Sequence, residues 1–507
     1  MSAEALPTAP FVLADHLPVL PIIVPLIGAA IAALMPRGWL AWAVATVSSV
    51  LVAILSVLLL LQVQETGTIS YALGGWEPPL GIEYRVDTLN AFVLMIVGAI
   101  GAVIMLYALE SVPQDVRPRQ QPFFYAIYLL CLCGLLGMAV TGDAFNIFVF
   151  MEISSLATYV LIAMGRDKRA LLAAYQYLIM GTIGATFYVL GIGLLYTVTG
   201  TLNLADIAGR IAEAYQVYPR AIIAALAFVI VGISLKLALF PLHVWLPNAY
   251  TFAPPFATVF LAATATKVAV YILLRMYFDV FGPAVSVEAL PVTQAIMILA
   301  LIAMFAASFL AFYENRVERM LAYSSVAQVG YIMLGMALAN ESGLTGGIVH
   351  LFNHAISKAA LFLAIGAVVF RLGHTRMEEL AGVGRRMPIT MAAFVVGGLS
   401  IIGVPGTAGF VSKWNLAMGA IENGTPFLVF LIMASSIIAV LYVGRFIEVA
   451  YFRAPTGDCE TARDPGLTML LPTLLMAAAV IYFGFETTYS ADLARDAARA
   501  LIGGSQG

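Results

Sequence analysis

The sequence predicts an all-α polytopic membrane protein with about fourteen transmembrane helices. Of its 507 residues, 62% are apolar and only 10% are charged, whereas soluble domains carry about 25% charged residues. The mean hydropathy is +0.97. Apolar runs of 18 or more residues recur along the chain, and as a helix each is long enough to cross a hydrocarbon core of about 30 Å.

The apolar runs follow one another from near the N-terminus to near the C-terminus. We place the fourteen helices at 18–35, 39–62, 87–109, 122–141, 144–164, 170–198, 220–246, 256–278, 292–312, 319–339, 344–370, 389–418, 425–450 and 467–485. The predicted parts of the chain are 1–120 with three helices, 121–280 and 281–455 with five helices each, and 456–507 with the last helix and a short tail. No cleavable signal precedes the first run, because no basic region comes before it.

The distribution of basic residues predicts the orientation. With the N-terminus outside, the inside loops hold 15 of the 25 lysines and arginines, and the outside segments hold 6. Because basic loops stay on the cytoplasmic side, we expect both termini on the outer side of a bacterial inner membrane. An even number of spans agrees with this, since it returns the chain to the side on which it began.

Ionisable residues inside the apolar runs are the candidate functional residues. The four remaining cations are all lysines, and one acid and two histidines accompany them: Lys236, Lys267, Lys358, Lys413, Glu152, His350 and His354. A buried charge costs about 2.5–3.5 kcal/mol at the centre of a membrane helix, so such residues usually line ion paths. Lysine, unlike arginine, can release its proton when it is desolvated. His350, His354 and Lys358 share one helix face, and the set predicts a proton relay.

Two apolar runs are interrupted by proline close to a lysine. Lys236 precedes Pro241 in "KLALFPLHVWLP", whereas Pro405 precedes Lys413 in "GVPGTAGFVSKWN". Broken helices are tolerated in a membrane where they face protein or a water-filled cavity. The reversed order of proline and lysine favours two inverted five-helix repeats, each with a broken helix, which is typical of transporters.

Five segments carry a resemblance to a known family. "GDAFNIFVFMEISSLATYVLIAMG", "SLKLALFPLHVWLPNAYTFAPP", "KVAVYILLR", "HLFNHAISKAALFL" and "GVPGTAGFVSKW" resemble the antiporter-like family of Mrp cation/proton antiporters, respiratory complex I and membrane-bound hydrogenases. The resemblance covers about 18–485 and is strongest to D-type Mrp subunits. It implies a Glu152–Lys236 pair, Lys267 as a bridge, Lys413 as the terminal group and the two helix-eleven histidines. Lys358 is found in some relatives only.

The resemblance also implies the partners and the activity. We expect a hetero-oligomer with subunits of the Mrp A, B, C, E, F and G type, transporting protons against sodium or potassium, and no nucleic-acid partner. The alternative within the family is a proton-pumping subunit of an NADH-quinone oxidoreductase or a membrane-bound hydrogenase.

Other classes of function are less well supported by the residues. We expect neither an enzyme nor a cofactor, because the sequence lacks a nucleotide-binding glycine motif and a haem or iron–sulfur cysteine pattern. We expect no metal either: His350 and His354 have the spacing of zinc ligands, but no carboxylate or cysteine accompanies them and Lys358 is a cation. A passive scaffold with structural charges remains the alternative of a different class.

Overall fold

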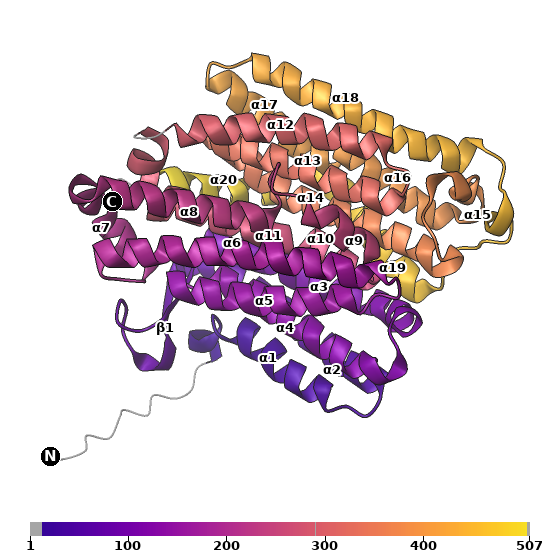
Figure 1. Cartoon of the computed structure of the whole chain (residues 1–507), viewed down its shortest axis with the longest axis horizontal. Coiled ribbons are helices and arrows are strands. Elements are labelled where there is room, and N and C mark those ends of the chain that lie inside the picture. The colour runs from indigo at the N-terminus through magenta and orange to yellow at the C-terminus, as the bar shows by residue number, and fades with distance from the viewer. Residues whose placement is uncertain (1–12, 289–290, 504–507) are drawn as a thin grey trace.

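The computed structural model describes residues 13–288 and 291–503 as a bundle of long helices (Figure 1). The α-helices of the first half are α1 (Leu20–Ala33), α2 (Gly38–Thr66), α3 (Thr88–Asp115), α4 (Gln121–Val140), α5 (Ala144–Ala163), α6 (Arg169–Thr199), α7 (Leu204–Val217), α8 (Pro219–Leu237), α9 (Trp245–Phe252), α10 (Pro255–Ala263) and α11 (Ala265–Leu274). Those of the second half are α12 (Val292–Tyr313), α13 (Val317–Leu338), α14 (Glu341–Leu372), α15 (Val383–Arg386), α16 (Pro388–Ile402), α17 (Ala408–Glu422), α18 (Phe427–Ile447), α19 (Leu467–Phe485) and α20 (Thr488–Gly503). The strands β1 (Ile69–Ala72) and β2 (Glu83–Val86) form an antiparallel hairpin.

The prediction of an all-α polytopic membrane protein is confirmed. Within the described residues, twelve helices are long and apolar enough to cross a membrane, or thirteen if the pair Met377–Arg386 and Pro388–Ile402, bent by 113°, counts as one span. The count is below fourteen for two reasons. Helix α1 has only 14 residues, and the apolar run 389–418 is divided between α16 and α17.

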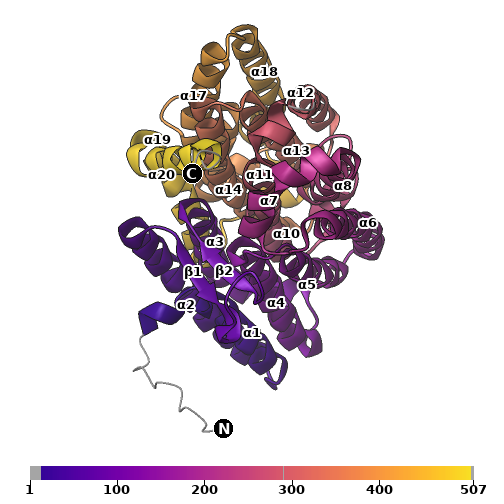
Figure 2. The same cartoon turned by 90° about the vertical axis from the view of Figure 1, so that its left-hand side faces the viewer.

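The long helices run side by side, and Figure 2 shows them nearly end-on. In that view α10, α11 and α14 lie near the middle of the bundle. Helix α14 is buried without interruption from Gly343 to Val368, as expected for a helix that is apolar all round. Any ionisable group on the central part of α14 is therefore shielded from bulk water and lipid.

Both prolines of the predicted breaks lie between helices. Helix α8 ends at Leu237, Ala238 adopts a left-handed conformation with φ of 59°, and Pro241 follows before α9 begins at Trp245. Helix α16 ends at Ile402, Gly403 has φ of 90°, and Pro405 follows before α17 begins at Ala408. Proline lacks the N–H that would continue a helix, so each span has free backbone groups at its break.

Several elements lie wholly or mostly outside the predicted helices, including the short helices α9 and α15. The β1–β2 hairpin and α7 occupy connections between spans, and α20 forms where the sequence suggested a short tail. Helix α20 packs its apolar face, including Leu493, Ala497 and Leu501, against the bundle, and an ion pair of 2.9 Å joins Arg499 to Glu341 of α14. The chain ends themselves, 1–12 and 504–507, lie outside the described residues.

Candidate functional site

Glu152 lies on the outward-facing side of α5. Its neighbours on that face, Phe145, Val149, Leu156 and Val160, are between 37% and 54% exposed, while Glu152 itself is half-buried. Its Oε1 atom is buried without a hydrogen-bond partner among the described residues. In apolar surroundings an unpaired carboxylate is costly, and the charge of Lys236 is the one that offsets part of this cost within the described residues.

Lys236 occupies the last turn of α8 and is 7% exposed. Its ammonium donates to Ser155 Oγ of α5 and lies 6.0 Å and 5.9 Å from the ring centres of Tyr159 and Tyr177. Glu152 and Lys236 are both described residues, and no carboxylate oxygen of Glu152 lies within 4.0 Å of the Lys236 ammonium. Their charges nevertheless interact over a longer distance. Lys236 is therefore held by Ser155, one turn beyond Glu152, and not by a direct ion pair.

A small cavity lies beside Lys236. Its volume is about 30 Å³, and Ser154, Ser155, Thr158 and Tyr177 supply its polar lining. A cavity of at least about 10–15 Å³ with two to four polar partners can hold a water molecule. One or two water molecules can therefore reach Lys236, which gives the ammonium a route for proton exchange.

Lys267 lies just after the break between α10 and α11, and it is 1% exposed. Its ammonium donates to the carbonyl oxygen of Ala262, in the last turn of α10. The carbonyl end of a helix carries a partial negative charge, so this position stabilises a cation. Lys267 is also within electrostatic range of His350 and His354.

Helix α14 presents His350 and His354 next to one another. Their rings are nearly parallel with centres 6.2 Å apart, and each residue is 2% exposed. His350 has a partner at each nitrogen: Nε2 donates to Gln328 Oε1 at 2.9 Å, and Nδ1 lies 2.7 Å from Ser412 Oγ. Both nitrogens of His354 are buried without a hydrogen-bond partner among the described residues, so neither nitrogen is fixed by a contact.

Lys358 lies at the other end of this stripe and is fully buried. Its ammonium donates to the Leu321 carbonyl at 2.7 Å and to Ser324 Oγ, both on α13. None of these acceptors is shared with Lys413 among the described residues. Lys358 thus forms a branch of the ionisable set.

Lys413 is the most completely coordinated of the four buried lysines. Its ammonium donates to the carbonyl oxygens of Ile401 and Ile402 at 2.9 Å each, and to Ser436 Oγ at 2.8 Å. The Tyr331 ring centre lies 4.4 Å away. The two carbonyls end α16 at the break. Lys413 therefore resembles Lys267 in its environment, since both cations sit at the carbonyl end of a broken helix.

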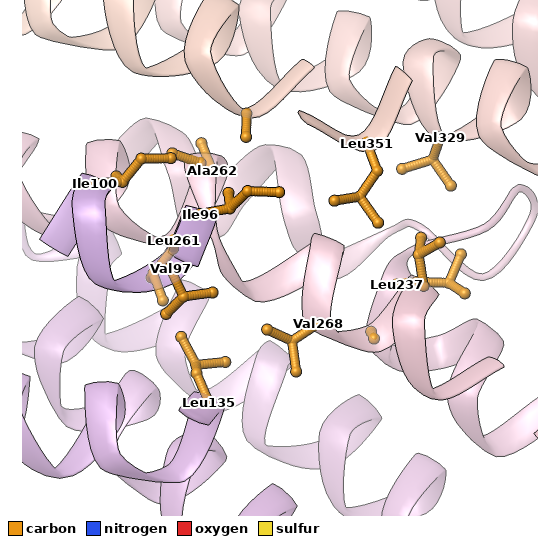
Figure 3. Packing of buried hydrophobic residues seen from close by; sticks show 14 of the residues in the cluster. Ile96, Val97, Ile100, Leu135, Leu237, Leu261, Ala262, Val268, Val329 and Leu351 are labelled. Atoms are coloured by element: carbon orange, nitrogen blue, oxygen red, sulfur yellow. The ribbon is translucent and has the colours of Figure 1, made fainter. Parts of the chain in front are cut away.

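Buried apolar side chains accompany the polar groups of the site. Figure 3 shows Leu237, Val268, Val329 and Leu351 packed around the middle of the bundle. They are the chain neighbours of Lys236, Lys267, Gln328 and His350, respectively. Such packing keeps the local dielectric low, which strengthens each charge–charge interaction along the set.

Sequence reasoning missed several polar residues of the site. Ser155, Gln328, Ser412 and Ser436 contact the lysines or His350 directly, but isolated serines and glutamines in an apolar helix give no distinct signal. His243 could have been found, because it follows Pro241 by two residues and histidine is rare in this chain. Its Nδ1 is buried without a partner in the described part of the chain, and its ring stacks on Phe240.

The comparison with known families is decisive. Residues 141–439 match the family described as NADH:quinone oxidoreductase/Mrp antiporter, TM. The chain belongs to this family. The match covers more than half of the chain and includes every ionisable residue of the site. The resemblance predicted from the motifs is confirmed: the chain is an antiporter-like subunit of the Mrp D type, related to complex I subunits.

Individual relatives come from both branches of the family. The NADH-quinone oxidoreductase subunit N of Desulforudis audaxviator is 40% identical, with 92% of this chain and 95% of the relative covered. The D-type subunit of the Na(+)/H(+) antiporter of Bacillus subtilis is 29% identical, with 96% and 97% covered.

Similar solved structures also come both from a respiratory membrane complex and from an Mrp complex. A chain of an archaeal membrane-bound sulfane sulfur reductase has 30% identity and a TM-score of 0.87, with 97% and 98% of the two chains covered. A chain of the Mrp complex from Dietzia sp. DQ12-45-1b has 26% identity and a TM-score of 0.89, with the same coverage. The antiporter-like subunits in these structures belong to multisubunit membrane complexes.

Proposed function

We propose that this chain moves protons through a lateral series of buried groups in a multisubunit monovalent cation/proton antiporter. The series comprises Glu152, Lys236, Lys267, His350, His354 and Lys413, with Lys358 as a branch. The supporting observation is the hydrogen-bonded contact of His350 with Ser412, the residue next to Lys413. It links the central helix α14 to the second broken helix.

The first half of the route centres on Lys236. Water in the adjoining cavity exchanges protons with the ammonium, and the distance of Glu152 sets how firmly the proton is held. A nearby carboxylate favours the ammonium, whereas burial without the carboxylate favours the neutral amine. Pro241 opens the helix beside this group, so that backbone and water reach it.

In the second half, His350 accepts or releases a proton without moving. Its Nε2–H donates to Gln328, and Ser412 Oγ–H can donate either to the Gly409 carbonyl, 3.0 Å away, or to Nδ1 of His350. When the hydroxyl turns toward Nδ1, the imidazole is neutral. When it turns to Gly409, Nδ1–H donates to Ser412 and the imidazole is a cation. A rotation of one hydroxyl therefore accommodates both protonation states.

The proton then reaches Lys413 and leaves through the region opened by Pro405. Sodium or potassium moves the other way, in a bacterial inner membrane with both chain ends on the outer side. Moving one charge across the membrane is worth about 2.3 kcal/mol per 100 mV. The membrane potential can therefore drive the exchange.

The outward position of Glu152 supports a hetero-oligomer. Glu152 lies on a face of α5 whose apolar residues Val149 and Leu156 are 37% and 54% exposed, and a neighbouring subunit would cover this face. The proposed partners are the A, B, C, E, F and G types of Mrp subunit.

The second candidate is a proton-pumping subunit of a respiratory NADH-quinone oxidoreductase or hydrogenase. The 40% identity to subunit N of Desulforudis audaxviator favours it, and the same lateral route would operate in it. The two differ in what drives the protons.

One experiment separates them. The complex would be purified with its natural subunits and reconstituted in vesicles with a trapped pH indicator. Proton movement on addition of sodium or potassium, in a preparation containing small antiporter subunits, supports the antiporter. Movement only on addition of an electron donor, such as NADH or hydrogen, together with its electron acceptor supports the respiratory complex and excludes the first proposal.

A further inference from the structure

A basic pocket lies at one end of the bundle, and none of the residues that line it belongs to the proton route. It is formed where the α1–α2 connection meets the end of α3 and the start of α4, and its volume is about 440 Å³. We define it by the residues Arg37, Trp39, Trp42, Arg119 and Gln121. The positive-inside rule assigns this end to the cytoplasmic side.

The charge of the pocket is not neutralised within the chain. Neither guanidinium, Arg37 nor Arg119, has an ion pair or side-chain hydrogen bond to any described residue. The other polar side chains are already engaged: Trp42 Nε1 donates to the Met105 carbonyl, and Gln121 donates to the Val116 carbonyl. Among the described residues of the pocket, the side-chain donors that stay free are the two guanidinia and the indole N–H of Trp39.

Two helix N-termini add to this positive character. Helix α2 begins at Gly38 and α4 begins at Gln121, both beside the pocket, and neither has a side-chain cap or an acid in its first turn. Free N–H groups and the helix dipole favour an anion at such ends. Guanidinia and helix ends together select a phosphate-like group.

The rim of the pocket is apolar. Trp39 lines the pocket and is 58% exposed. Leu34 and Phe123, two residues along the chain from the lining residues Pro36 and Gln121, are 81% and 56% exposed, and all three lie where helices begin or end. Tryptophan is typical of the membrane–water interface. A ligand that fits both parts has an anionic head for the guanidinia and hydrocarbon chains for the rim.

We propose that the basic pocket binds the headgroup of an anionic phospholipid from the cytoplasmic leaflet. Basic pockets between membrane helices on this side suit such headgroups. The volume lies within the range of about 300–1,000 Å³ that is common for ligand sites. The site is separate from the proton route. Through it the chain would bind anionic phospholipids in preference to neutral ones.

The test is lipid titration of the full chain, delipidated in detergent and monitored by native mass spectrometry. Phosphatidylglycerol and phosphatidylcholine are compared on wild type, on the double variant Arg37→Gln/Arg119→Gln, and on Arg386→Gln. Arg386 is the control, since it is also exposed, unpaired among the described residues and assigned to the inside, but lies outside the pocket.

Each arginine near anionic lipid is worth about fivefold in affinity, so the double variant should bind phosphatidylglycerol about 30-fold more weakly. Arg386→Gln and the affinity for phosphatidylcholine should be unchanged. Equal binding of both lipids by wild type, a loss below about threefold in the double variant, or an equal loss in the control overturns the proposal.

A second measurement locates the lipid. Phosphatidylglycerol with brominated acyl chains should quench the tryptophan fluorescence of wild type more than that of Trp39→Phe. The difference is the quenching of Trp39 itself. Soluble glycerol phosphate should not displace the lipid at equal concentration. Displacement would show that the pocket binds a free anion. Quenching that is unaffected by Trp39→Phe would show that the lipid binds elsewhere. Either result overturns the lipid assignment.

Discussion

Replacing Lys413 with arginine tests whether this residue carries a mobile proton or only a fixed charge. The ammonium of Lys413 donates three hydrogen bonds of 2.8–2.9 Å, to two carbonyls at the end of α16 and to Ser436. A guanidinium has five N–H donors and can satisfy the same three acceptors. Lys413→Arg therefore preserves the charge and the hydrogen bonding while it removes the ability to deprotonate.

The expected loss follows from the ordinary pKa values of the two side chains. Lysine has a pKa of about 10.4 and arginine one of about 12.5–13.8. The deprotonated fraction thus falls by about 100- to 2,500-fold in any shared environment, and proton transport should fall at least about 100-fold. Lys413→Ala is a poorer probe, because it leaves two buried carbonyls without donors at about 1–3 kcal/mol each.

The assay is cation-driven proton movement in vesicles containing the assembled complex, with assembly checked on a native gel. Lys168→Arg is the control, because it makes the same chemical change at an exposed loop position. If Lys413→Arg retains more than about half of the wild-type rate in a fully assembled complex, a fixed charge suffices. The extended route through the second broken helix would then be refuted.

Three further changes test other parts of the structure. Glu152→Gln keeps the size of the side chain and should abolish transport without loss of assembly; normal vesicle antiport would disprove control of the proton by this carboxylate. Lys236→Arg should be as damaging as Lys236→Ala in the same assay, and near-normal transport by the arginine variant would contradict a carrier role. Gly232→Ala should destabilise the chain by about 2–3 kcal/mol, because its Cβ would lie 2.6 Å from the Gly184 carbonyl oxygen. Gly193→Ala is the control, because a Cβ at this position of α6 would meet open space, and it should raise the midpoint temperature of unfolding slightly. Equal midpoint temperatures for the two alanine variants would contradict the close packing of α6 on α8.

The membrane-spanning helices were predictable because their signal is local. Each apolar run had to be long enough for the bilayer, and each isolated lysine or acid stood out against 62% apolar composition. The positions of Pro241 and Pro405 between helices also follow from the proline ring itself. The basic pocket left no such signal, since Arg37 and Arg119 are ordinary loop residues in the sequence.

The partners of the ionisable groups were not predictable from the sequence. Ser155 holds Lys236 across 81 positions of the chain, and Ser412 holds His350 across 62. The motif resemblance implied Glu152 as the charge partner of Lys236, and only the structure revealed Ser155 as the hydrogen-bond acceptor of its ammonium. Helix α20 likewise depends on packing against α14 and not on its own hydropathy.

The sequence by itself determined that this chain is a membrane protein, which ionisable residues lie within its apolar helices and where two of these helices break. Each of these depends on one residue or one short run, because transfer into a bilayer is decided by the residues transferred. Only the tertiary structure decided that Lys267 and Lys413 face helix carbonyl ends, that His354 has no hydrogen-bond partner within the described chain and that Glu152 looks outward. These properties depend on the relative rotation of packed helices, and a rotation of one residue, about 100°, would turn each side chain away from its present surroundings.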